Sequence, residues 1–316
     1  MINKIHDASL DFTQIKPSDF ETNLNEEISP LIKQIIDESD LQIAKISNTE
    51  RDNCILKILN AIRDPKLRTA GIHRHQDWES GWTQNLNSLE DESSTTPLLP
   101  RYFGKSEYVR WRKDFVKGKP GHDYRVLDIL VHWMLEKYMK NLESIYEFGC
   151  GPGHHLKAAR FINEHANITG LDWAKSSQSI ISKISDKGII KNISGKYFDF
   201  FNPDYSIDIP RDSGFYTVAA LEQVGQNFEP FLDFVLAKKP LICAHIEPIE
   251  ELLEPDNLID CLSMWYFQKR KYLSGFLTRL RSLEKEGRIQ IHKEQRSYTG
   301  SLFIEGHSIV IWSPTQ

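Results

Sequence analysis

A run of glycines is the strongest chemical signal in the sequence. It reads Glu147-Phe-Gly149-Cys-Gly151-Pro-Gly153-His-His155 and follows an apolar run typical of a strand. Glycines at such a turn let the backbone come close to a ligand and present N–H groups at the start of a helix. In a parallel sheet, ligands bind beyond the carboxyl ends of the strands. The turn therefore predicts a ligand site, with a ligand-free structural turn as the alternative.

The spacing of these glycines separates two kinds of cofactor. A dinucleotide site with the pattern GxGxxG would place its third glycine at position 154, which is His154. The third glycine is Gly153 instead, and the resulting E-x-G-x-G-x-G pattern resembles that of class I S-adenosylmethionine-dependent methyltransferases. This resemblance implies S-adenosyl-L-methionine as the cofactor. It places Glu147 near the amino group of the methionine part and Gly149, Gly151 and Gly153 along the amino-acid and ribose parts.

The same resemblance, which extends over residues 141–316, implies further contacts after the next two strands. An acidic residue about 20 positions after the glycine turn binds ribose hydroxyls in such sites, and Asp172 follows an apolar run at that place. Trp173 would pack on the adenine or the ribose. Asp199, near the end of the third strand, would contact the adenine amino group, and Phe200 would help to sandwich the flat base. Acids after successive strands favour the cofactor site over a ligand-free turn.

Polar residues, most of which can exchange a proton, stand at the predicted strand ends. His154 lies inside the glycine turn, Glu222 and Gln223 follow the fourth strand, and Glu247 lies near the end of the fifth. We therefore predict these four residues as the candidates for catalysis. Ordinary loop polarity is the alternative for Glu222 and Gln223. Positioning of the acceptor without a base is a further alternative for the reaction as a whole.

Other histidines are open to structural interpretations. His245 shares a strand face with Glu247, and its position is more typical of a hydrogen-bonded core histidine. For His155, a solvent-exposed place at the start of a helix is the alternative to a site residue. His73 and His75 lack further ligands at regular spacing, so we expect no metal.

These candidates need a sheet to position them, and the second half of the chain predicts one. Short β-prone runs alternate there with helical runs, which is typical of βαβ units and a parallel sheet. The last two strands lack an intervening helix, so they would pair antiparallel. The prediction is an α/β fold with a Rossmann-like doubly wound sheet, mostly parallel with an antiparallel edge strand. The strands are predicted at 144–148, 167–171, 196–200, 215–220, 240–246, 288–292 and 308–312, and the last long helical stretch at 258–286.

Residues 1–140 are predicted to form a mainly helical N-terminal extension, and residues 141–316 the cofactor-binding domain. The segment 71–82 is dense in His, Trp, Asp and Gln. Such a composition suits a sugar or a polar aromatic ligand. We interpret the extension as a lid or acceptor platform, with a structural cap that packs its tryptophans as the alternative.

Composition and charge exclude several classes of protein. The chain has 316 residues, of which 40% are hydrophobic and 26% charged, and its four cysteines form no CxxC pair. No apolar run approaches the ~20 residues that cross a bilayer, and the first residues lack a signal peptide pattern. These features predict a cytoplasmic protein that contacts no membrane. Its net charge is −5, so the broad basic surface of a nucleic-acid-binding protein is missing.

We predict an enzyme, a methyltransferase that transfers a methyl group by in-line displacement to a small-molecule acceptor. The segment Leu-Glu-Gln-Val-Gly after the fourth strand replaces the Asn/Asp-Pro-Pro-aromatic run of base-amine methyltransferases, so a nucleic acid substrate is not expected. The layout is similar to bacterial methyltransferases of sugar and natural-product biosynthesis, which implies a hydroxyl acceptor. The alternatives are a protein or peptide methyltransferase, which would dock through the basic segment 101–119, and a non-catalytic subunit that binds the cofactor. The acceptor atom and the oligomeric state stay open.

Overall fold

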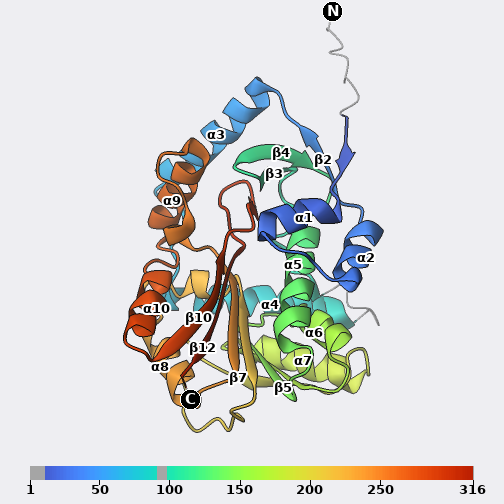
Figure 1. The fold of residues 1–316 in the computed structure, drawn as a ribbon, viewed down its shortest axis with the longest axis vertical. Helices are drawn as coiled ribbons and strands as arrows, with labels where there is room; N and C mark the ends of the chain where they lie inside the picture. Colours follow the sequence, from blue (N-terminus) through green and yellow to red (C-terminus); the bar gives the residue numbers. More distant parts are fainter. Residues whose placement is uncertain (1–10, 91–97, 316) are drawn as a thin grey trace, which may run out of the picture.

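The structure is a computed structural model that describes residues 11–90 and 98–315 (Figure 1). Its main element is a seven-stranded sheet in the order β10-β12-β9-β8-β5-β6-β7. The strands from β5 to β9 run parallel, and β12 runs antiparallel to both of its neighbours. The bounds are β5 (Ser144–Phe148), β6 (Asn167–Asp172), β7 (Ile193–Tyr197), β8 (Gly214–Val218), β9 (Ile242–Glu247), β10 (Ile289–Gln295) and β12 (Ser308–Pro314).

This topology confirms the predicted fold class, a Rossmann-like sheet of the class I methyltransferase type. The last two strands pair with each other at one edge, as their short connection predicts. The antiparallel strand itself is second from that edge, because β12 is inserted between β9 and β10. The strand order reverses beside β5, with β6 on one side and β8 on the other. A ligand site is expected at this switch point, beyond the carboxyl ends of the strands.

Helices cover both faces of the sheet and divide its core in two. Alternate strand residues face opposite sides, so Ile145 packs with one set of helices and Tyr146 with the other. The first set contains α5 (His122–Met139), α6 (Leu156–Ile162) and α7 (Lys175–Asp186), and the second contains α8 (Glu229–Lys238) and α10 (Phe276–Lys285). Because both faces are covered, the central strands are buried and nearly continuous in hydrophobicity.

Several predicted bounds shift by a few residues in the structure, and two of these differences change how the site is described. The third strand ends at Tyr197 rather than at residue 200, so Asp199 and Phe200 lie in the loop that follows. The helical stretch 258–286 is two helices, α9 (Leu258–Arg270) and α10. Lys271 adopts a left-handed conformation (φ 53°), and its N–H caps α9 by donating to the carbonyls of Gln268 and Phe267.

The N-terminal region contains helices and also a sheet that the sequence analysis did not predict. Its helices are α1 (Pro17–Leu24), α2 (Pro30–Glu38), α3 (Asn48–Arg63) and α4 (His75–Glu90). The second sheet has the order β1-β2-β4-β3-β11, formed by β1 (Thr13–Gln14), β2 (Gln42–Lys45), β3 (Tyr108–Trp111), β4 (Asp114–Gly118) and β11 (Thr299–Gly300). Since β11 belongs to the connection between β10 and β12, the sheet joins the first and last parts of the chain.

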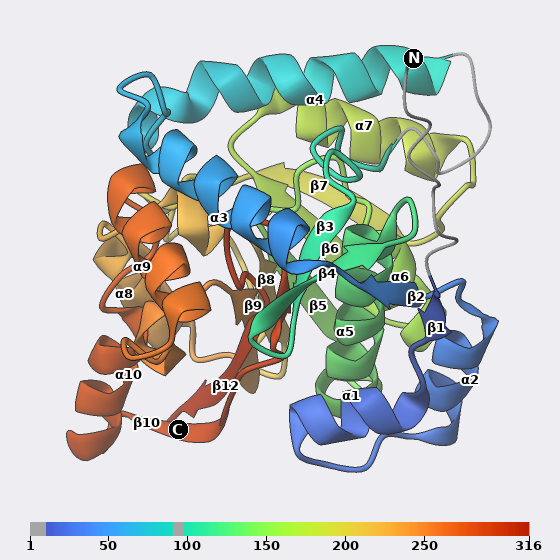
Figure 2. The same ribbon diagram turned by 90° about the horizontal axis from the view of Figure 1, so that it is seen from above.

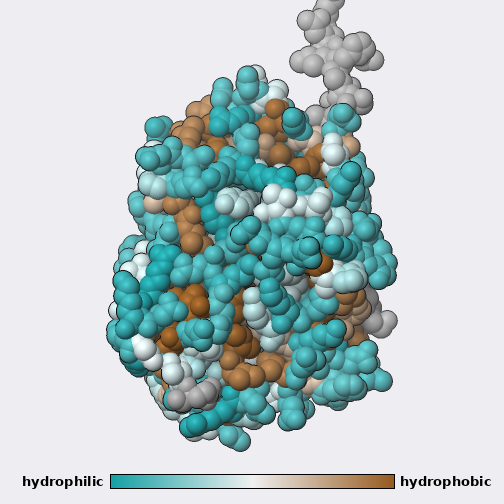
Figure 3. Space-filling model, in the orientation of Figure 1, coloured by the Kyte–Doolittle hydropathy of each residue, from teal (hydrophilic) through white to brown (hydrophobic). Residues whose placement is uncertain are grey.

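The region before residue 141 also contributes directly to the main core. Helix α5 packs against the seven-stranded sheet, beside α6 (Figure 1). The face in Figure 3 is mainly hydrophilic, with smaller hydrophobic patches. Within residues 11–90 and 98–315, none of the helices has the length and hydrophobicity needed to cross a bilayer.

Candidate functional site

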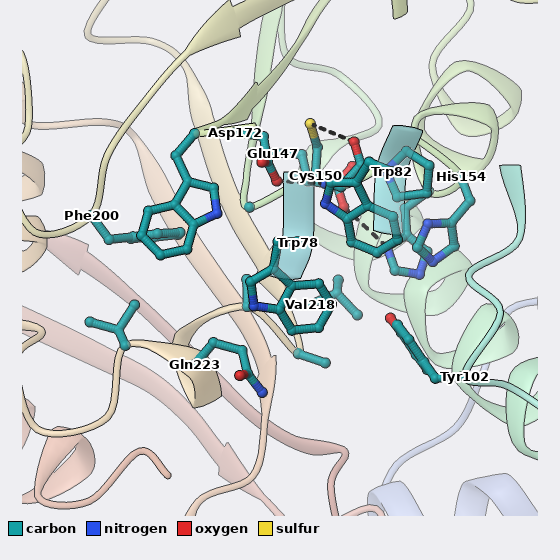
Figure 4. Close-up of a pocket in the computed structure, with 18 of the residues that line it drawn as sticks. Trp78, Trp82, Tyr102, Glu147, Cys150, His154, Asp172, Phe200, Val218 and Gln223 are labelled. Atoms are coloured by element: carbon teal, nitrogen blue, oxygen red, sulfur yellow. Dashed lines mark hydrogen bonds and ion pairs between the residues drawn. The ribbon is translucent and has the colours of Figure 1, made fainter. Parts of the chain in front are cut away.

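A cavity with an empty volume of about 680 Å³ lies beyond the carboxyl ends of β5, β6 and β8. The structure brings many of the predicted residues together here, while two tryptophans of α4 close the other side (Figure 4). The predicted residues that line the cavity are Glu147, Gly149, Gly151, His154, Asp172, Trp173, Phe200 and Gln223.

The glycine turn follows β5 and is held to the end of β6. The N–H groups of Gly149 and Cys150 donate to the carbonyl of Leu171 at 2.7 and 3.1 Å. Gly149 has a φ of 72°, a left-handed conformation that favours glycine. A Cβ on Gly149 would overlap with the Cβ of Ala220 after β8. The turn therefore brings the ends of three neighbouring strands into close contact.

Asp172 ends β6 and fixes the second part of this turn. Its Oδ2 accepts the N–H of Gly151 at 2.9 Å, and its Oδ1 accepts the N–H of Ala174 at 2.8 Å. Burial raises the pKa of this carboxyl to about 6, although the two backbone donors act in the opposite direction. Asp172 is therefore mainly ionised at neutral pH, and each of its oxygens has a further lone pair for a ligand hydroxyl.

Glu147 connects the site to the start of α6. Its Oε1 lies 3.0 Å from Nδ1 of His155, and its Oε2 accepts the hydroxyl of Tyr216 at 2.9 Å. All three side chains are buried, which excludes the solvent-exposed position considered for His155. The arrangement holds the His155 ring in place and leaves its Nε2 buried without a hydrogen-bond partner in the part of the chain that the structure describes.

Several more buried polar atoms around the cavity lack partners among the described residues. They are both ring nitrogens of His154, Nε1 of Trp78 and Oε1 of Gln223. Burial lowers the pKa of His154 well below its usual value, and His155 adds to this effect, so its imidazole is neutral at neutral pH. A buried polar group without a partner costs about 1–3 kcal/mol. Their concentration at one cavity indicates a ligand that completes these hydrogen bonds.

Aromatic rings form two walls of the cavity. On the β6 side, Trp173 stacks on Phe201 with ring centres 5.8 Å apart, and Phe200 lies nearby. On the opposite side, Trp78 and Trp82 from α4 stack at 5.4 Å (Figure 4). Flat ligands pack well between such rings.

Helix α4 lies over the site and is anchored at several points. It runs beside α7 (Figure 2). The carboxylate of Glu79 accepts the N–H groups of Lys175 and Ser176 at 2.7 and 3.1 Å, at the start of α7. Nε2 of His75 lies 3.2 Å from the carbonyl oxygen of Trp173. Trp82 packs directly on Gly151, since a Cβ there would lie 2.9 Å from its ring.

A second, larger chamber with an empty volume of about 1460 Å³ adjoins this cavity. Trp78, Tyr102, Ala219 and Gln223 line both spaces. Glu222 lines the larger chamber only, and its Oε1 accepts Nε2–H of Gln223 at 2.7 Å. Burial raises the pKa of Glu222 to about 7, opposed by this hydrogen bond and by the nearby positive charges. A carboxyl with this pKa can accept a proton near neutral pH.

Three predicted site residues, Gly153, Asp199 and Glu247, line neither the cavity nor the larger chamber. Gly153 packs on the side chains of Leu156 and Ile181. Asp199 caps the following loop, because its Oδ1 accepts the N–H of Phe201 at 2.9 Å. Glu247 is buried under the loop after β8. Neither Asp199 nor Glu247 lines the described cavity, and both carboxylates accept hydrogen bonds from loop N–H groups.

Glu247 has a clear structural task. Its carboxylate accepts the N–H groups of Ala220, Leu221 and Glu222 at 2.9, 3.0 and 3.2 Å. The position of Glu247 near the end of its strand predicted that it lies close to the site. Its carboxylate oxygens, however, are already bonded to these three N–H donors. Glu247 thereby fixes the backbone of residues 220–222, from which the side chain of Glu222 lines the larger chamber.

We expect Glu247→Gln to lower the stability of the fold by about 1–3 kcal/mol, because an amide NH₂ would face backbone N–H donors. Thermal unfolding measures this loss. The matched control is Glu229→Gln, which alters an exposed ion pair with Arg279 and should leave the melting temperature nearly unchanged. Equal melting temperatures for both variants would contradict the role of Glu247.

Trp78, Trp82, Tyr102 and Ala219 also line the cavity and are not among the predicted site residues. The spacing of the two tryptophans, four residues apart on a helix, was an available signal because it places them on one face. Ala219 gave no signal, since its left-handed conformation (φ 49°) is visible only in the structure.

Comparisons with known proteins find no matching family model and no matching curated protein. Solved structures do resemble the chain. Magnesium protoporphyrin IX methyltransferase from Synechocystis PCC 6803, solved with bound SAH, shares 13% identity over 61% of this chain and 86% of its own, with a TM-score of 0.44.

Human N-acetylserotonin methyltransferase in complex with SAM shares 12% identity over 94% of this chain and 74% of its own (TM-score 0.44). The [4+2]-cyclase SpnF shares 14% identity over 78% of this chain and 96% of its own (TM-score 0.47). Identities this low assign no activity to this chain. Its fold class follows from its own sheet order, and its chemistry from the geometry of the two adjoining cavities.

Proposed function

We propose that the protein is an S-adenosylmethionine-dependent methyltransferase that acts on a hydroxyl group of a small molecule. The observation that carries this proposal is the cavity at the switch point of the sheet, where the glycine turn, a buried carboxylate and unpartnered polar atoms meet. The larger chamber beside it would hold the acceptor.

The residues that line the cavity fit the chemistry of this cofactor. Asp172 has free lone pairs for the ribose hydroxyls, and Glu147 has them for an ammonium group, because each oxygen accepts only one hydrogen bond within the described chain. Trp173 and Phe200 would flank the adenine. The neutral ring of His154 and the amide oxygen of Gln223 lack partners there and would hydrogen-bond to the polar groups of the ligand.

When bound, S-adenosylmethionine supplies a methyl group on a positively charged sulfur, and the electrons of the broken C–S bond return to sulfur. The chain's own part is to align the acceptor, exclude water and remove the hydroxyl proton. Glu222 is the proposed base, because it lines the acceptor chamber next to Gln223, which borders both spaces. Its carboxylate would take the proton as the oxygen forms its new bond to carbon.

The shape of the acceptor chamber supports a small molecule over a protein substrate. It is lined by aromatic side chains, including Tyr102, Phe103 and Tyr272, and Trp78 lines both this chamber and the cofactor cavity. A ring-shaped acceptor such as a sugar or an aromatic metabolite would pack against these groups.

Calorimetric titration of the purified protein with S-adenosylhomocysteine, S-adenosylmethionine and NAD⁺ tests the proposal. We expect the first two to bind with affinities in the micromolar range and NAD⁺ not to bind. A labelled methyl donor is then added to fractionated extracts, and we expect label in small molecules. Absence of binding to folded protein would overturn the proposal. Label on proteins would indicate a peptide methyltransferase, and binding without label a non-catalytic subunit.

A further inference from the structure

Two arginine side chains from distant parts of the chain line the acceptor chamber together. Arg74 precedes α4 and Arg270 ends α9. Backbone hydrogen bonds bring them together: the N–H of Ala70 donates to the carbonyl of Arg270 at 2.7 Å, and the N–H of Gly71 donates to the carbonyl of Gln223 at 2.9 Å. The segment that carries Arg74 is therefore fixed to both α9 and the loop after β8.

Both guanidinium groups have unused hydrogen-bond donors. Nη1 of Arg74 and Nε of Arg270 are buried without a partner in the described chain. Arg270 stacks on Tyr272, with its guanidinium carbon 4.8 Å from the ring centre, and its Nη1 donates weakly to the Tyr266 hydroxyl at 3.3 Å. No ion pair to Arg270 occurs among residues 11–90 and 98–315. Arginine donors that remain buried and unpaired are unusual, because the guanidinium group is always charged.

The local balance of charge leaves a positive excess. Asp77 is shared between Arg74 at 2.6 Å and Arg68 at 2.8 Å, so one carboxylate serves two cations. Arg270 adds another positive charge. The carboxylate of Glu222 neutralises at most one of these positive charges. Within the described residues, it forms no ion pair with either arginine of the chamber. Lys105 and Asp123, which also line the chamber, balance each other.

We propose that Arg74 and Arg270 bind a carboxylate group of the acceptor, which would make the substrate a hydroxylated small-molecule acid. This inference rests on the proposed function. The planar fork of an arginine matches the geometry of a carboxylate, and the aromatic walls of the chamber accommodate a ring that carries it. An anion at the two arginines would hold the acceptor beside Glu222 and Gln223, at the border with the cofactor cavity.

The test uses two probes of equal shape and different charge, 4-(trifluoromethyl)benzoate and 4-(trifluoromethyl)benzamide. Their binding to the full-length protein, with S-adenosylhomocysteine added, is measured by ¹⁹F NMR line broadening. We expect the benzoate to bind at least about tenfold more tightly than the amide, which is the scale of one charge-assisted arginine contact. Arg270→Met and Arg74→Met should each remove most of this preference. Arg279→Met, at an exposed ion pair on α10, is the matched control and should retain it.

Equal binding of the two probes, no binding of the benzoate, or an unchanged preference in both chamber variants would overturn the inference. Methionine keeps much of the packing of the arginine stem, and Arg270→Lys, which keeps the charge, should retain part of the preference even if Arg270→Met proves unstable. Calorimetry of S-adenosylhomocysteine in the same samples separates the two hypotheses. Loss of the benzoate preference with intact cofactor binding rejects the carboxylate site only, while absent cofactor binding rejects the proposed function.

Discussion

Replacing Glu222 by Gln is expected to reduce methyl transfer by about 10²–10⁴-fold, the usual contribution of a general base. The amide has nearly the same shape but cannot accept the proton of the acceptor hydroxyl. Affinity for S-adenosylhomocysteine should stay unchanged, because Glu222 lines the acceptor chamber and not the cofactor cavity. The rate is measured with the acceptor that labelled-methyl screening of extracts identifies, and binding is measured by calorimetry.

The role of Glu222 as a base also predicts how the rate of methyl transfer changes with pH. A base must be ionised to act, and burial raises the pKa of Glu222 to about 7, so the rate should increase as pH rises through about 7. Glu222→Gln should lose this increase. Its surface control, Glu229→Gln, should keep it. A variant rate within about threefold of the wild-type rate, or an unchanged pH profile, would contradict the role of Glu222 as base.

Stability offers a second readout that needs no acceptor. Because the pKa of Glu222 in the fold lies above its ordinary value of 4.5, the protonated form favours folding. Its stabilising contribution is therefore complete below about pH 4.5 and is lost as pH rises through about 7. Denaturant unfolding of wild type and Glu222→Gln should diverge over this range, with the wild type losing more stability. Parallel curves would show that the carboxyl is not buried in the way described.

The central strands and the glycine turn were predictable because their signals are local. β5, β8 and β9 are buried on both faces and appear as continuous apolar runs. The edge strand β7 is partly exposed and polar. The apolar residues that suggested a strand there are Phe198 and Phe200. They lie in the loop after β7 and pack against Phe231 of α8. The predicted strand, 196–200, therefore ends three residues beyond β7, and Asp199 was placed in the strand instead of the loop.

The second sheet was not predicted, because its hairpin turn lacks the usual sequence signal. The turn between β3 and β4 has Arg112 and Lys113 in left-handed conformations, with φ values of 51° and 64°. Such hairpin turns are recognised by Asn or Gly at these positions, and neither is present. Within the basic segment 101–119, Arg110 is buried and donates to backbone carbonyls of residues 259, 302 and 303.

Long-range packing explains what the sequence could not indicate about the site. Asp172 follows from its spacing after the turn, whereas the position of α4 depends on contacts between Glu79 and the start of α7. The acceptor chamber likewise depends on the hydrogen bonds that fix residues 70 and 71. None of these contacts leaves a periodic pattern in the sequence. The histidine of β9, His245, was interpreted correctly as a core residue: its ring bonds to Thr217 and Trp312.

Asp172→Asn is expected to weaken S-adenosylhomocysteine binding by at least about 100-fold. Hydrogen bonds to a buried charged group contribute about 1.5–3 kcal/mol each, and a tenfold change in affinity corresponds to 1.4 kcal/mol. Two ribose hydroxyls would donate to this carboxylate. The amide would also place an NH₂ donor against the N–H of Gly151 or Ala174. Calorimetry measures the affinity, and Asp233→Asn on the exposed face of α8 is the matched control.

The wild-type protein supplies an independent check, because the variant also disturbs the glycine turn. Burial raises the pKa of Asp172 to about 6, and the ionised carboxylate is the form that accepts hydroxyl donors. Affinity should therefore be constant above about pH 7 and decrease as pH falls through about 6, approaching tenfold per pH unit for a single proton. Thermal unfolding at each pH confirms that the fold persists. Constant affinity between pH 5 and 8, together with a variant that binds within about threefold of wild type, would exclude Asp172 as the ribose contact and leave it only its structural hold on the turn.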